Sequence, residues 1–425
     1  MVIFAATLML GSGAWAGTER VLYSFTGGHD GSYPFDIGRF ARDSSGSLFG
    51  TTGYGGNLKD CSGRGCGTVF ELKSSKGGYE EKTIHTFTGG KDGAYPGAGV
   101  ILDSSGNIYG TTGGGSNNCG TVFELSGSRL TTLHSFSCGA DGAGPGGLIR
   151  DKSGNLYGTT YAGGNLSCNP PGGCGVAYEI SSSGAFSVLY TFCANGGCTD
   201  GANPASSLVI DGSGALFGMT EFGGFKDFGA VFELSKASHG WKESVLHSFR
   251  GSDGSYPIYS GLTLGTQKIG KRKVSTIFGV TAVGGSKTCS GAGCGTAFEM
   301  HKAKTGYELT TLHNFIGQNG DGATPWGTLI EVNGRLFGTT YGGGDLSQPC
   351  QPPETGCGTV FELTQKNRVW SETIVYTFSG NDGDNPISGL AVDSSGHLFG
   401  VTARGGSSGT GCGGYGCGTV FEVTP

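Results

Sequence analysis

One three-residue motif recurs seven times in this chain, and it constrains the fold more than any other feature of the sequence. The motif is His or Tyr, then Ser, Thr or Asn, then Phe, and its copies begin at Tyr23, His85, His134, Tyr190, His247, His313 and Tyr376. Consecutive copies are 49 to 66 residues apart, a period that is typical of repeat architectures in which each unit packs on its neighbours. The sequence therefore predicts seven copies of one structural unit.

Each unit contains four short runs that are typical of β-strands. A unit reads D-G-x-x-P, an apolar run, D-x-x-G-x-(L/I)-(F/Y)-G-x-T, a glycine-rich loop, and G-(T/A/V)-(V/A)-(F/Y)-E, and it ends at the next copy of the motif. The runs are rich in β-branched and aromatic residues and are separated by turn residues. We name the four strands a to d in chain order. Seven such units predict an all-β, seven-bladed β-propeller with four antiparallel strands in each blade.

The two ends of the repeat region complete one another. A d strand is expected at residues 20–25, before any a, b or c strand, and the last expected strand is a c strand at residues 418–423. Each strand type occurs seven times only if the N-terminal d strand completes the last blade. A ring closed in this way leaves no exposed terminal sheet edge.

Composition excludes several other classes of protein. The 425 residues include 88 glycines, and a glycine inside a helix costs about 1 kcal/mol relative to alanine, so helical bundles and coiled coils are excluded. The net charge of -6 provides no basic surface, so no nucleic-acid partner is expected. No apolar run approaches the roughly 18 residues of a membrane helix, so no membrane span is expected.

The repeated residues resemble a known family. The run LFGTT, the glycine loop and GTVFEL, with D-G-x-x-P before them, are similar to the bacterial Gloeobacter/Verrucomicrobia (GloVer) tandem repeat, and the similarity extends over residues 20–425. The resemblance implies an exported protein with a repeat fold. It implies no established biochemical activity.

The first residues of the chain resemble a secretory signal peptide. Residues 2–10 are apolar, and Ala14-Trp15-Ala16 before Gly17 has the small-x-small pattern of a cleavage site. No Lys or Arg precedes the apolar run, so a first core strand is the alternative. We expect residues 1–16 to be a signal peptide and residues 17–425 to form one propeller domain, secreted or at the cell surface and monomeric.

The cysteines also favour export. Twelve of the 14 form six close pairs, and we expect the other two to join each other; the pairs are Cys61/Cys66, Cys168/Cys174, Cys193/Cys198, Cys289/Cys294, Cys350/Cys357, Cys412/Cys417 and Cys119/Cys138. Zinc binding is the alternative, but the spacings are not C-x-x-C and no histidine regularly accompanies them. Seven disulfides in an oxidising compartment are therefore expected, as staples of long surface loops. All lie in b-to-c or d-to-a loops, which emerge on one face of a propeller.

Three polar residues recur in every unit, and we interpret them as structural. They are the D-G aspartate, the b-strand threonine and the c-strand glutamate; the aspartates are Asp30, Asp92, Asp141, Asp200, Asp253, Asp321 and Asp382. The alternative is a ring of carboxylates that binds a cation at the channel mouth. A catalytic site needs different groups in different places, whereas a residue present seven times has the same role seven times. The motif histidines are interpreted as packed ring donors for the same reason, because Tyr replaces them in three units.

The disulfide-bearing face is the predicted ligand face. Loops held by disulfides lose less conformational entropy on binding, and exposed aromatic rings suit stacking on sugars. We expect this face to bind an extracellular polysaccharide or protein through Tyr33, Tyr95, Tyr161, Tyr256, Trp326 and Tyr341. The alternative for Tyr33, Tyr95 and Tyr256 is packing on the prolines that follow them. Other unrepeated residues on this face are Tyr54, Asp60, Asp345, Glu354 and Arg404.

Unrepeated acids supply the candidates for catalysis. Asp36, Glu221 and Asp227 are the candidate catalytic residues, and Glu221 with Asp227 could form an acid-base pair or a cation site. The alternative is solvated surface acids. No cofactor is required, a divalent cation is possible, and no metal ligands are assigned. On the opposite face, the fifth unit carries a basic turn with Lys268, Lys271, Arg272 and Lys273, which indicates either an anionic partner or a solvated hairpin tip.

Three functions are compatible with these residues. The first is a secreted binding module. The second is an extracellular propeller enzyme, a polysaccharide lyase or hydrolase, whose site in the central funnel uses unrepeated acids. The third is a scaffold in a surface assembly. The first is favoured because the loops differ among units, whereas no acid-base-nucleophile set is visible.

Overall fold

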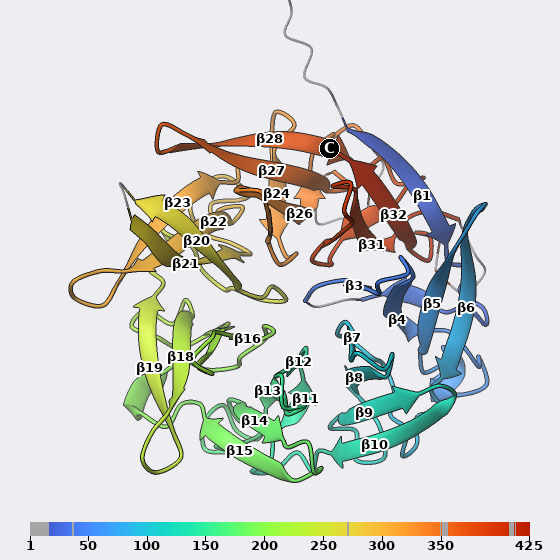
Figure 1. Ribbon diagram of the computed structural model, residues 1–425, viewed down its shortest axis with the longest axis horizontal. Helices are drawn as coiled ribbons and strands as arrows, with labels where there is room; N and C mark the ends of the chain where they lie inside the picture. The colour runs from blue at the N-terminus through green and yellow to red at the C-terminus, as the bar shows by residue number, and fades with distance from the viewer. Residues whose placement is uncertain are drawn as a thin grey trace, which may run out of the picture.

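The computed structural model describes residues 17–35, 38–269, 272–348, 350, 356–407, 412 and 414–425. Seven antiparallel sheets stand around a central axis as the blades of a propeller, which confirms the predicted fold (Figure 1). We number the blades 1 to 7 from the sheet of β2 (Ser32–Pro34) to the sheet that contains the last strand. The expected signal peptide, residues 1–16, lies outside the described residues. No helix among the described residues has the length and hydropathy of a membrane span.

Strands b, c and d form the body of each blade. The b strands are β4 (Leu48–Tyr54), β8 (Ile108–Thr112), β13 (Leu156–Ala162), β17 (Leu216–Thr220), β21 (Arg272–Thr281), β26 (Arg335–Gly343) and β31 (Leu398–Arg404). The c strands are β5 (Thr68–Ser75), β9 (Thr121–Ser126), β14 (Val176–Ile180), β18 (Ala230–Lys236), β22 (Thr296–Lys302), β27 (Thr359–Lys366) and β32 (Thr419–Thr424). The d strands, at the outer edge of the ring, are β6 (Gly78–Thr86), β10 (Arg129–Ser135), β15 (Phe186–Thr191), β19 (Trp241–Ser248), β23 (Tyr307–Asn314), β28 (Val369–Thr377) and β1 (Thr18–Ser24).

Except in blade 5, the inner strands have only two or three residues and are shorter than the sequence predicts. The a strands are β3 (Ala41–Arg42), β7 (Ile101–Leu102), β12 (Ile149–Arg150), β16 (Val209–Ile210), β20 (Thr263–Ile269), β25 (Ile330–Val332) and β30 (Ala391–Val392). In four blades the D-G-x-x-P segment forms a separate short strand on strand b: β2, β11 (Ala143–Pro145), β24 (Gly322–Pro325) and β29 (Asp384–Pro386). Two 3-10 turns, η1 (Cys61–Gly63) and η2 (Gly196–Cys198), lie in the loops.

A contact between blades explains the short a strands. The hydroxyl of Thr51, in strand b of blade 1, donates a hydrogen bond of 3.1 Å to the carbonyl of Ala98 in blade 2. Thr111 makes the same contact with Gly146 of blade 3, and Thr339 with Ser388 of blade 7. The middle of the inner segment therefore accepts hydrogen bonds from the preceding blade, and it meets its own strand b only at single points, such as the bond from the N–H of Gly146 to the carbonyl of Thr159.

The N-terminal strand closes the ring, as predicted. β1 pairs with β32 from Thr18 opposite Thr424 to Ser24 opposite Thr419. The first and last coloured strands lie side by side in Figure 1. Blade 7 therefore takes its d strand from the start of the chain and its other strands from the end.

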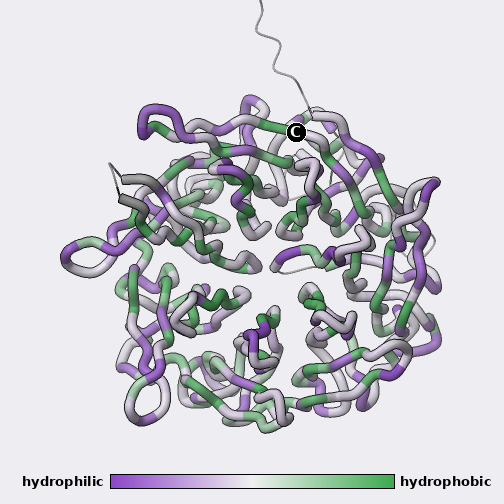
Figure 2. The backbone as a smooth tube through the Cα atoms, viewed as in Figure 1, coloured by the Kyte–Doolittle hydropathy of each residue, from purple (hydrophilic) through white to green (hydrophobic). Residues whose placement is uncertain are grey.

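The hydrophobic core is divided into layers between adjacent blades. At every interface the Phe of the seven-fold motif packs edge-on against the c-strand aromatic residue of the next blade, with ring centroids 4.9 to 5.5 Å apart. All of these rings are buried; the motif residues are Phe25, Phe87, Phe136, Phe192, Phe249, Phe315 and Phe378. Hydrophobic residues are accordingly spread through every blade in Figure 2. The repeated motif is thus the contact that joins one blade to the next.

The basic turn of blade 5 forms an extended hairpin. β20 and β21 pair from Thr263 opposite Phe278 to Ile269 opposite Arg272. The side chains predicted to form the basic cluster, at Lys268, Lys271, Arg272 and Lys273, lie outside the described part of the structure.

Candidate ligand-binding face

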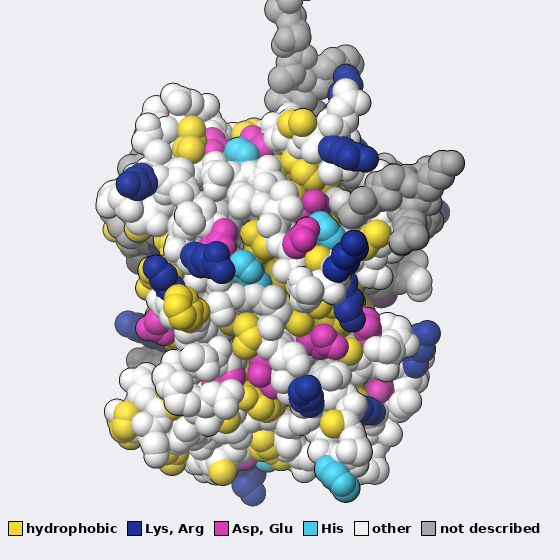
Figure 3. Space-filling model, turned by 90° about the vertical axis from the view of Figure 1, so that its left-hand side faces the viewer, with side chains coloured by type: hydrophobic (Ala, Val, Ile, Leu, Met, Phe, Trp, Pro, Cys, Tyr) yellow, Lys and Arg dark blue, Asp and Glu magenta, His cyan; other side chains and the backbone are white. Residues whose placement is uncertain are grey.

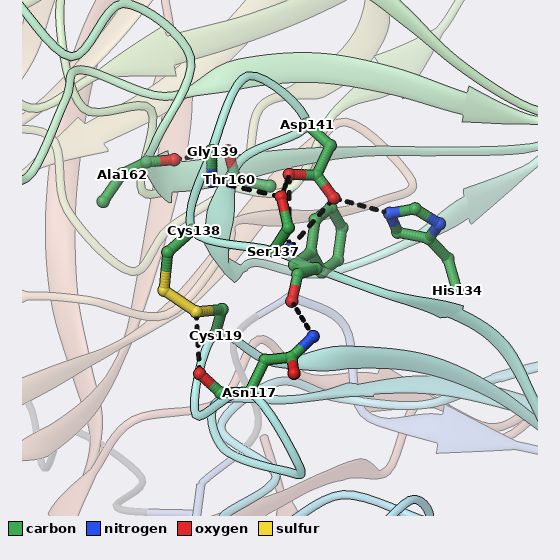
Figure 4. The surroundings of a disulfide bond; sticks show 10 residues. Asn117, Cys119, His134, Ser137, Cys138, Gly139, Asp141, Thr160 and Ala162 are labelled. Carbon is green, nitrogen blue, oxygen red and sulfur yellow. Dashed lines mark hydrogen bonds and ion pairs between the residues drawn. A yellow bond between two sulfur atoms is a disulfide. The ribbon is translucent and has the colours of Figure 1, made fainter.

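All seven predicted disulfides are present. Six link the cysteines of a close pair, including Cys289 to Cys294. The seventh, Cys119 to Cys138, joins the b-to-c loop of blade 2 to the loop that leads into blade 3 (Figure 4). The pairing expected from the sequence is therefore confirmed.

Six of these bridges tie a loop to the core, because one of their two cysteines is buried. In six blades the cysteine just before strand c is buried in the core, and its disulfide partner is more exposed; the buried residues are Cys66, Cys119, Cys174, Cys294, Cys357 and Cys417. Cys294, for example, is 0% exposed and belongs to a core cluster with Val280 and Phe315. These cysteines are buried because they lie directly before strand c, at the interface between two blades. Their apolar sulfur atoms fill space in the core there.

The buried cysteines also bond to the next blade through their backbone. The carbonyl of Cys294 accepts a 2.7 Å hydrogen bond from the N–H of Thr324. In the same way the N–H of Tyr33 donates to Cys417 over 2.9 Å, and that of Tyr95 donates to Cys66 over 2.8 Å. The disulfides therefore anchor the loops at the junctions between blades.

The D-G aspartates hold the turn at each junction. Asp141 accepts hydrogen bonds from the backbone N–H and the hydroxyl of Ser137, and its carboxylate lies 3.2 Å from Nε2 of His134 (Figure 4). These bonds hold the pKa of Asp141 below its usual value in spite of partial burial. The other six aspartates each accept a backbone N–H and contact the motif His or Tyr. The seven-fold acids therefore have a structural role.

Glycine at the next position has no substitute. Gly31 has φ +96°, and a Cβ there would lie 2.0 Å from Oγ1 of Thr52. That hydroxyl contacts Thr68 in strand c over 2.8 Å, so the D-G turn packs directly on the threonine pair. A side chain at this position would separate the turn from the blade.

The residue before the motif proline has a left-handed backbone in all seven blades. Gly144, Asn203 and Asn385 have φ of 62°, 55° and 58° and belong to types that adopt this region readily. Three blades instead place a tyrosine there, at Tyr33 (φ 58°), Tyr95 (φ 54°) and Tyr256 (φ 49°). A non-glycine residue with this backbone costs of the order of 1 kcal/mol, and such strain clusters at binding sites. Thr324 (φ 55°) completes the set in blade 6, so the left-handed backbone belongs to the repeat and does not by itself distinguish the tyrosines.

An aromatic network runs across the mouth of the central channel. Rings from blades 1, 2, 5 and 6 contact one another in sequence, with centroids 4.1 to 6.1 Å apart: Tyr95, Tyr54, Tyr33, Phe35, Tyr259, Trp326 and Tyr341. Phe35 of blade 1 reaches Tyr259 of blade 5 at 5.5 Å. The network therefore connects blades that are not neighbours in the ring.

A cleft lies beside this network where blades 7 and 1 meet. It has a volume of about 460 Å³, and Tyr33, Tyr54, Arg64, Arg404 and Tyr415 line it. The guanidinium of Arg404 lies 5.7 Å from the ring centre of Tyr33, and Tyr415 is half exposed. Aromatic faces and guanidinium groups in one cleft can stack on a planar or ring-shaped ligand and bind an anionic group.

The two candidate acids of blade 4 have different surroundings. Asp227 is exposed, and its Oδ1 accepts a 2.7 Å hydrogen bond from the N–H of Gly223 in its own loop. Burial raises the pKa of Glu221, and a hydrogen bond from Tyr161 partly offsets this. Burial and the charge of Glu221 raise the pKa of Tyr161. Glu221 is therefore paired with a tyrosine of blade 3, whereas Asp227 stabilises a turn.

The central channel forms a second cavity, of about 470 Å³. The inner segments of blades 1 to 6 line it, mainly with aliphatic side chains such as Val100, Leu208 and Leu262, together with Arg39. Burial lowers the pKa of Arg39. The walls of this channel offer few polar groups to a ligand.

In the part of the chain that the structure describes, three groups of side chains have the composition of a metal site. They are Cys168/Cys174/Cys193/Cys198, Cys350/Cys357/Asp384 and His313/Asp321/Glu372. The cysteines in the first two groups are oxidised to disulfides, so they offer no thiolate. The third group retains its ligand atoms.

The predicted ligand-binding residues are found at several places on this face. Tyr33, Tyr95 and Trp326 belong to the aromatic network, and Tyr341 belongs to it but is only 6% exposed. Tyr161 is exposed beside Glu221, and Tyr256 packs against Phe222 and Phe228. Asp36 and Glu354 lie outside the described residues. Asp60 and Asp345 bond within their own loops.

The repeat decides the family. A family model of the Gloeobacter/Verrucomicrobia repeat matches residues 41–272, which is more than half of the chain. The chain belongs to the Gloeobacter/Verrucomicrobia repeat family. Its repeat motif also continues beyond residue 272, because blades 6 and 7 contain the same aspartate contacts and edge-on Phe pairs as the others. A comparison with curated proteins gives no significant match.

Solved structures share the fold of this Gloeobacter/Verrucomicrobia repeat protein at low identity. One is the extracellular domain of a proposed one-component system from B. thetaiotaomicron, with TM-score 0.51 and 10% identity over 94% of this chain and 39% of that chain. Another is an ancestral GH74 enzyme, with TM-score 0.51 and 11% identity over 92% of this chain and 48% of that chain. At such identities the likeness shows the propeller fold alone.

Sequence reasoning missed several residues of the face. Phe35, Tyr259, Arg64 and Tyr415 were not among the predicted binding residues. The position of Phe35, after the motif proline, varies among the units, and the equivalent residue in blade 6 is the predicted Trp326. Arg64 and Tyr415 lie in glycine-rich loops of different length, and no repeat position indicates where their side chains meet.

Proposed function

We propose that this protein is an exported module that binds a polysaccharide on its disulfide-bearing face. The observation that carries the proposal is the cleft between blades 7 and 1, in which Tyr33, Tyr54 and Tyr415 lie with Arg64 and Arg404. Tyrosine rings stack on the apolar faces of sugars, and their hydroxyls hydrogen bond to sugar oxygens. None of these five residues belongs to the seven-fold set that builds the blades, so the repeat does not explain their presence in the cleft.

The two arginines favour an acidic sugar. Guanidinium groups bind carboxylates through paired hydrogen bonds, and Arg64 is exposed at the edge of the cleft. The class of ligand that fits this cleft best is therefore a uronic-acid polysaccharide.

Seven disulfides support the proposed location. Disulfides persist in oxidising compartments, and the cytosol keeps most thiols reduced. We place the mature protein, residues 17–425, outside the cytoplasm as a single domain, with residues 1–16 as its export signal.

A glycan array followed by calorimetry tests this proposal. We expect wild-type protein to bind oligogalacturonate in preference to neutral oligosaccharides, with an affinity that falls as salt rises. Tyr33→Asn copies the residue of blades 4 and 7, and we expect it, like Arg404→Ala, to weaken binding about 10-fold or more, or roughly 1.4 kcal/mol. Arg129→Ala, in the c-to-d hairpin of blade 2 on the opposite face, is the matched control and should leave binding unchanged. Equal affinity in all four proteins, or no binding by the wild type, would contradict the proposal.

Glycoside or uronide cleavage is a second candidate function, favoured by one observation. Glu221 is a partly buried acid with a raised pKa on the proposed ligand face, next to the hydroxyl of Tyr161. A carboxyl group in such surroundings can act as a general acid. If the protein cleaves a bound polysaccharide, Glu221→Gln should lower the rate by two orders of magnitude or more and leave binding intact, with Asp227→Asn as the control. A rate that Glu221→Gln leaves unchanged would exclude this role for Glu221.

A further inference from the structure

Each junction between blades brings three polar or ring-bearing positions together. The first is the His or Tyr of the seven-fold motif, and the second is the D-G aspartate that follows it. The third lies on strand d of the next blade. It is the residue that pairs with the apolar residue directly after the glutamate of strand c. The strand register assigns this third position to Glu81, Leu130, Phe186, Glu243, Leu309, Glu372 and Glu19, in blades 1 to 7.

The first and third positions vary together. Where the third residue is Glu81, Glu243 or Glu19, the ring is a tyrosine: Tyr23, Tyr190 or Tyr376. Where the third residue is apolar, the ring is a histidine; Phe186, for example, stacks on His134 with ring centroids 3.8 Å apart. The junction between blades 5 and 6 departs from both arrangements. Among these seven described junctions, it alone combines a histidine with a glutamate.

This junction presents three ligand atoms to one another. Nε2 of His313 lies 3.2 Å and 3.3 Å from the two oxygens of Asp321, and Asp321 also accepts a 2.7 Å hydrogen bond from the N–H of Ile316. One ligand atom from each of His313, Asp321 and Glu372 lies within 4.8 Å of the other two. Strands β23 and β28, which carry His313 and Glu372, are neighbours at the rim of the ring.

In the described part of the chain, Glu372 has a buried oxygen without a partner, as Glu19 and Glu243 have at the equivalent positions, but of these three only Glu372 lies beside a histidine. Its Oε1 is buried and has no hydrogen-bond partner among the described residues. A buried carboxylate without a partner is costly, and a second carboxylate nearby adds repulsion. A cation between the two acids would remove both penalties.

The ligand set suits zinc. Zn²⁺ binds His nitrogen and Asp or Glu oxygen at about 2.0 to 2.2 Å, and three protein ligands with a water molecule complete a tetrahedral site. Ca²⁺ and Mg²⁺ prefer oxygen ligands only, and softer ions prefer sulfur. We propose that His313, Asp321 and Glu372 bind one Zn²⁺ ion at the outer edge of the junction between blades 5 and 6. The ion would link the two blades as the Tyr-Asp-Glu and His-Asp-apolar sets link the others.

Figure 3 shows the setting of such sites on the rim. Histidine side chains lie beside acidic ones on this side of the molecule, and basic side chains are dispersed around them. At the proposed site the side chains of His313 and Asp321 are 23% and 12% exposed, so an ion could enter from solvent and still be held mainly by protein atoms.

The chain itself supplies variants that should fold. His313→Tyr converts the site to the Tyr-Asp-Glu arrangement of three other junctions, and Glu372→Leu converts it to the His-Asp-apolar arrangement. The matched control is His247→Tyr, which changes a His-Asp pair, of Nε2 to Oδ2 distance 3.0 Å, that has Leu309 at the third position. The three variants should have wild-type circular dichroism in the presence of EDTA.

Calorimetric titration of Zn²⁺ into tag-free, oxidised protein at pH 7.5 tests the proposal. We expect one zinc ion per wild-type and His247→Tyr chain, and an affinity at least 10-fold lower in His313→Tyr and Glu372→Leu. A saturating excess of zinc should raise the Tm of wild-type protein and not that of the two site variants. The proposal is overturned if wild-type protein binds no zinc more tightly than Glu372→Leu does. It is also overturned if Ca²⁺ binds this site more tightly than Zn²⁺.

Discussion

A chain that begins at Thr26 is expected to lose cooperative folding, whereas a chain that begins at Gly17 should unfold like the full-length protein. The first truncation removes β1, which is the d strand of blade 7, together with Phe25. Phe25 is fully buried and packs against Phe70 of blade 1 at 5.1 Å. Loss of one such ring costs about 3–5 kcal/mol, and a typical domain is stable by only about 5–15 kcal/mol. Loss of the strand also exposes the edge of β32.

Thermal unfolding with light scattering checks this prediction. The chain that begins at Thr26 should show aggregation and no sharp transition. Phe136→Ala removes the equivalent ring at the junction between blades 2 and 3 and leaves every strand in place. This variant therefore separates the loss of one side chain from the loss of ring closure. We expect Phe136→Ala to lower the stability by about 3–5 kcal/mol and to keep a single transition. A monomeric protein from Thr26 with an unchanged Tm would show that the ring does not depend on β1.

Stability is expected to decline as the pH rises from about 4.5 to 7. Burial, together with the charge of Asp382 or Asp200, raises the pKa of Glu19 and that of Glu243 from 4.5 to about 7. Burial and the charge of Asp321 raise the pKa of Glu372 in the same way. In this interval the folded protein retains protons that the unfolded chain releases, so a higher pH favours unfolding. The stabilisation is fully present below pH 4.5 and is lost once the pH passes 7. Because these groups are partly solvated, we expect of the order of 1 kcal/mol from each.

Urea unfolding from pH 4.5 to 8 in EDTA measures the slope. The double variant Glu19→Gln/Glu243→Gln should lose most of the decline, because an amide is neutral at every pH. Below about pH 4 the stability should fall again, since hydrogen bonds lower the pKa of aspartates such as Asp92 and Asp253. Parallel slopes for the double variant and the wild type would contradict this assignment.

The fold could be predicted because its contacts repeat. Phe25 and its six equivalents each make the same ring contact, and the aspartate of each D-G turn bonds the same turn, so one pattern in the sequence reports seven structural sites. The closure of the ring followed from the order of strand types at the two ends. The short a strands could not be predicted, because the contact of Thr51 with Ala98 links different blades and no local pattern encodes it. The burial of Cys294 and its equivalents was missed for the same reason, since it depends on the neighbouring blade.

The candidate site was predictable only in part. Tyr33, Tyr95 and Tyr256 could be selected as unrepeated residues, but their left-handed backbone contradicts the extended conformation expected before proline. The contact of Phe35 with Tyr259 depends on the diameter of the closed ring. Arg64, Arg404 and Tyr415 converge because the last blade closes against the first. Such convergence depends on closure of the whole ring and not on any single repeat.

Repeated and unrepeated residues have different places in this molecule. The seven-fold aspartate, threonine and phenylalanine sets build the blades and the junctions, so departures from them indicate function. The cleft of Arg64 and Arg404 is one departure, and the pairing of His313 with Glu372 is another. The two lie at different junctions, and either proposal can fail without affecting the other.

A crystal structure of the protein soaked with oligogalacturonate tests the proposed function most directly. We expect sugar density in the cleft between blades 7 and 1, with a sugar ring on Tyr33 and a uronate carboxylate at Arg404. Density in the central channel or on the opposite face, with the cleft empty, would contradict the proposed function.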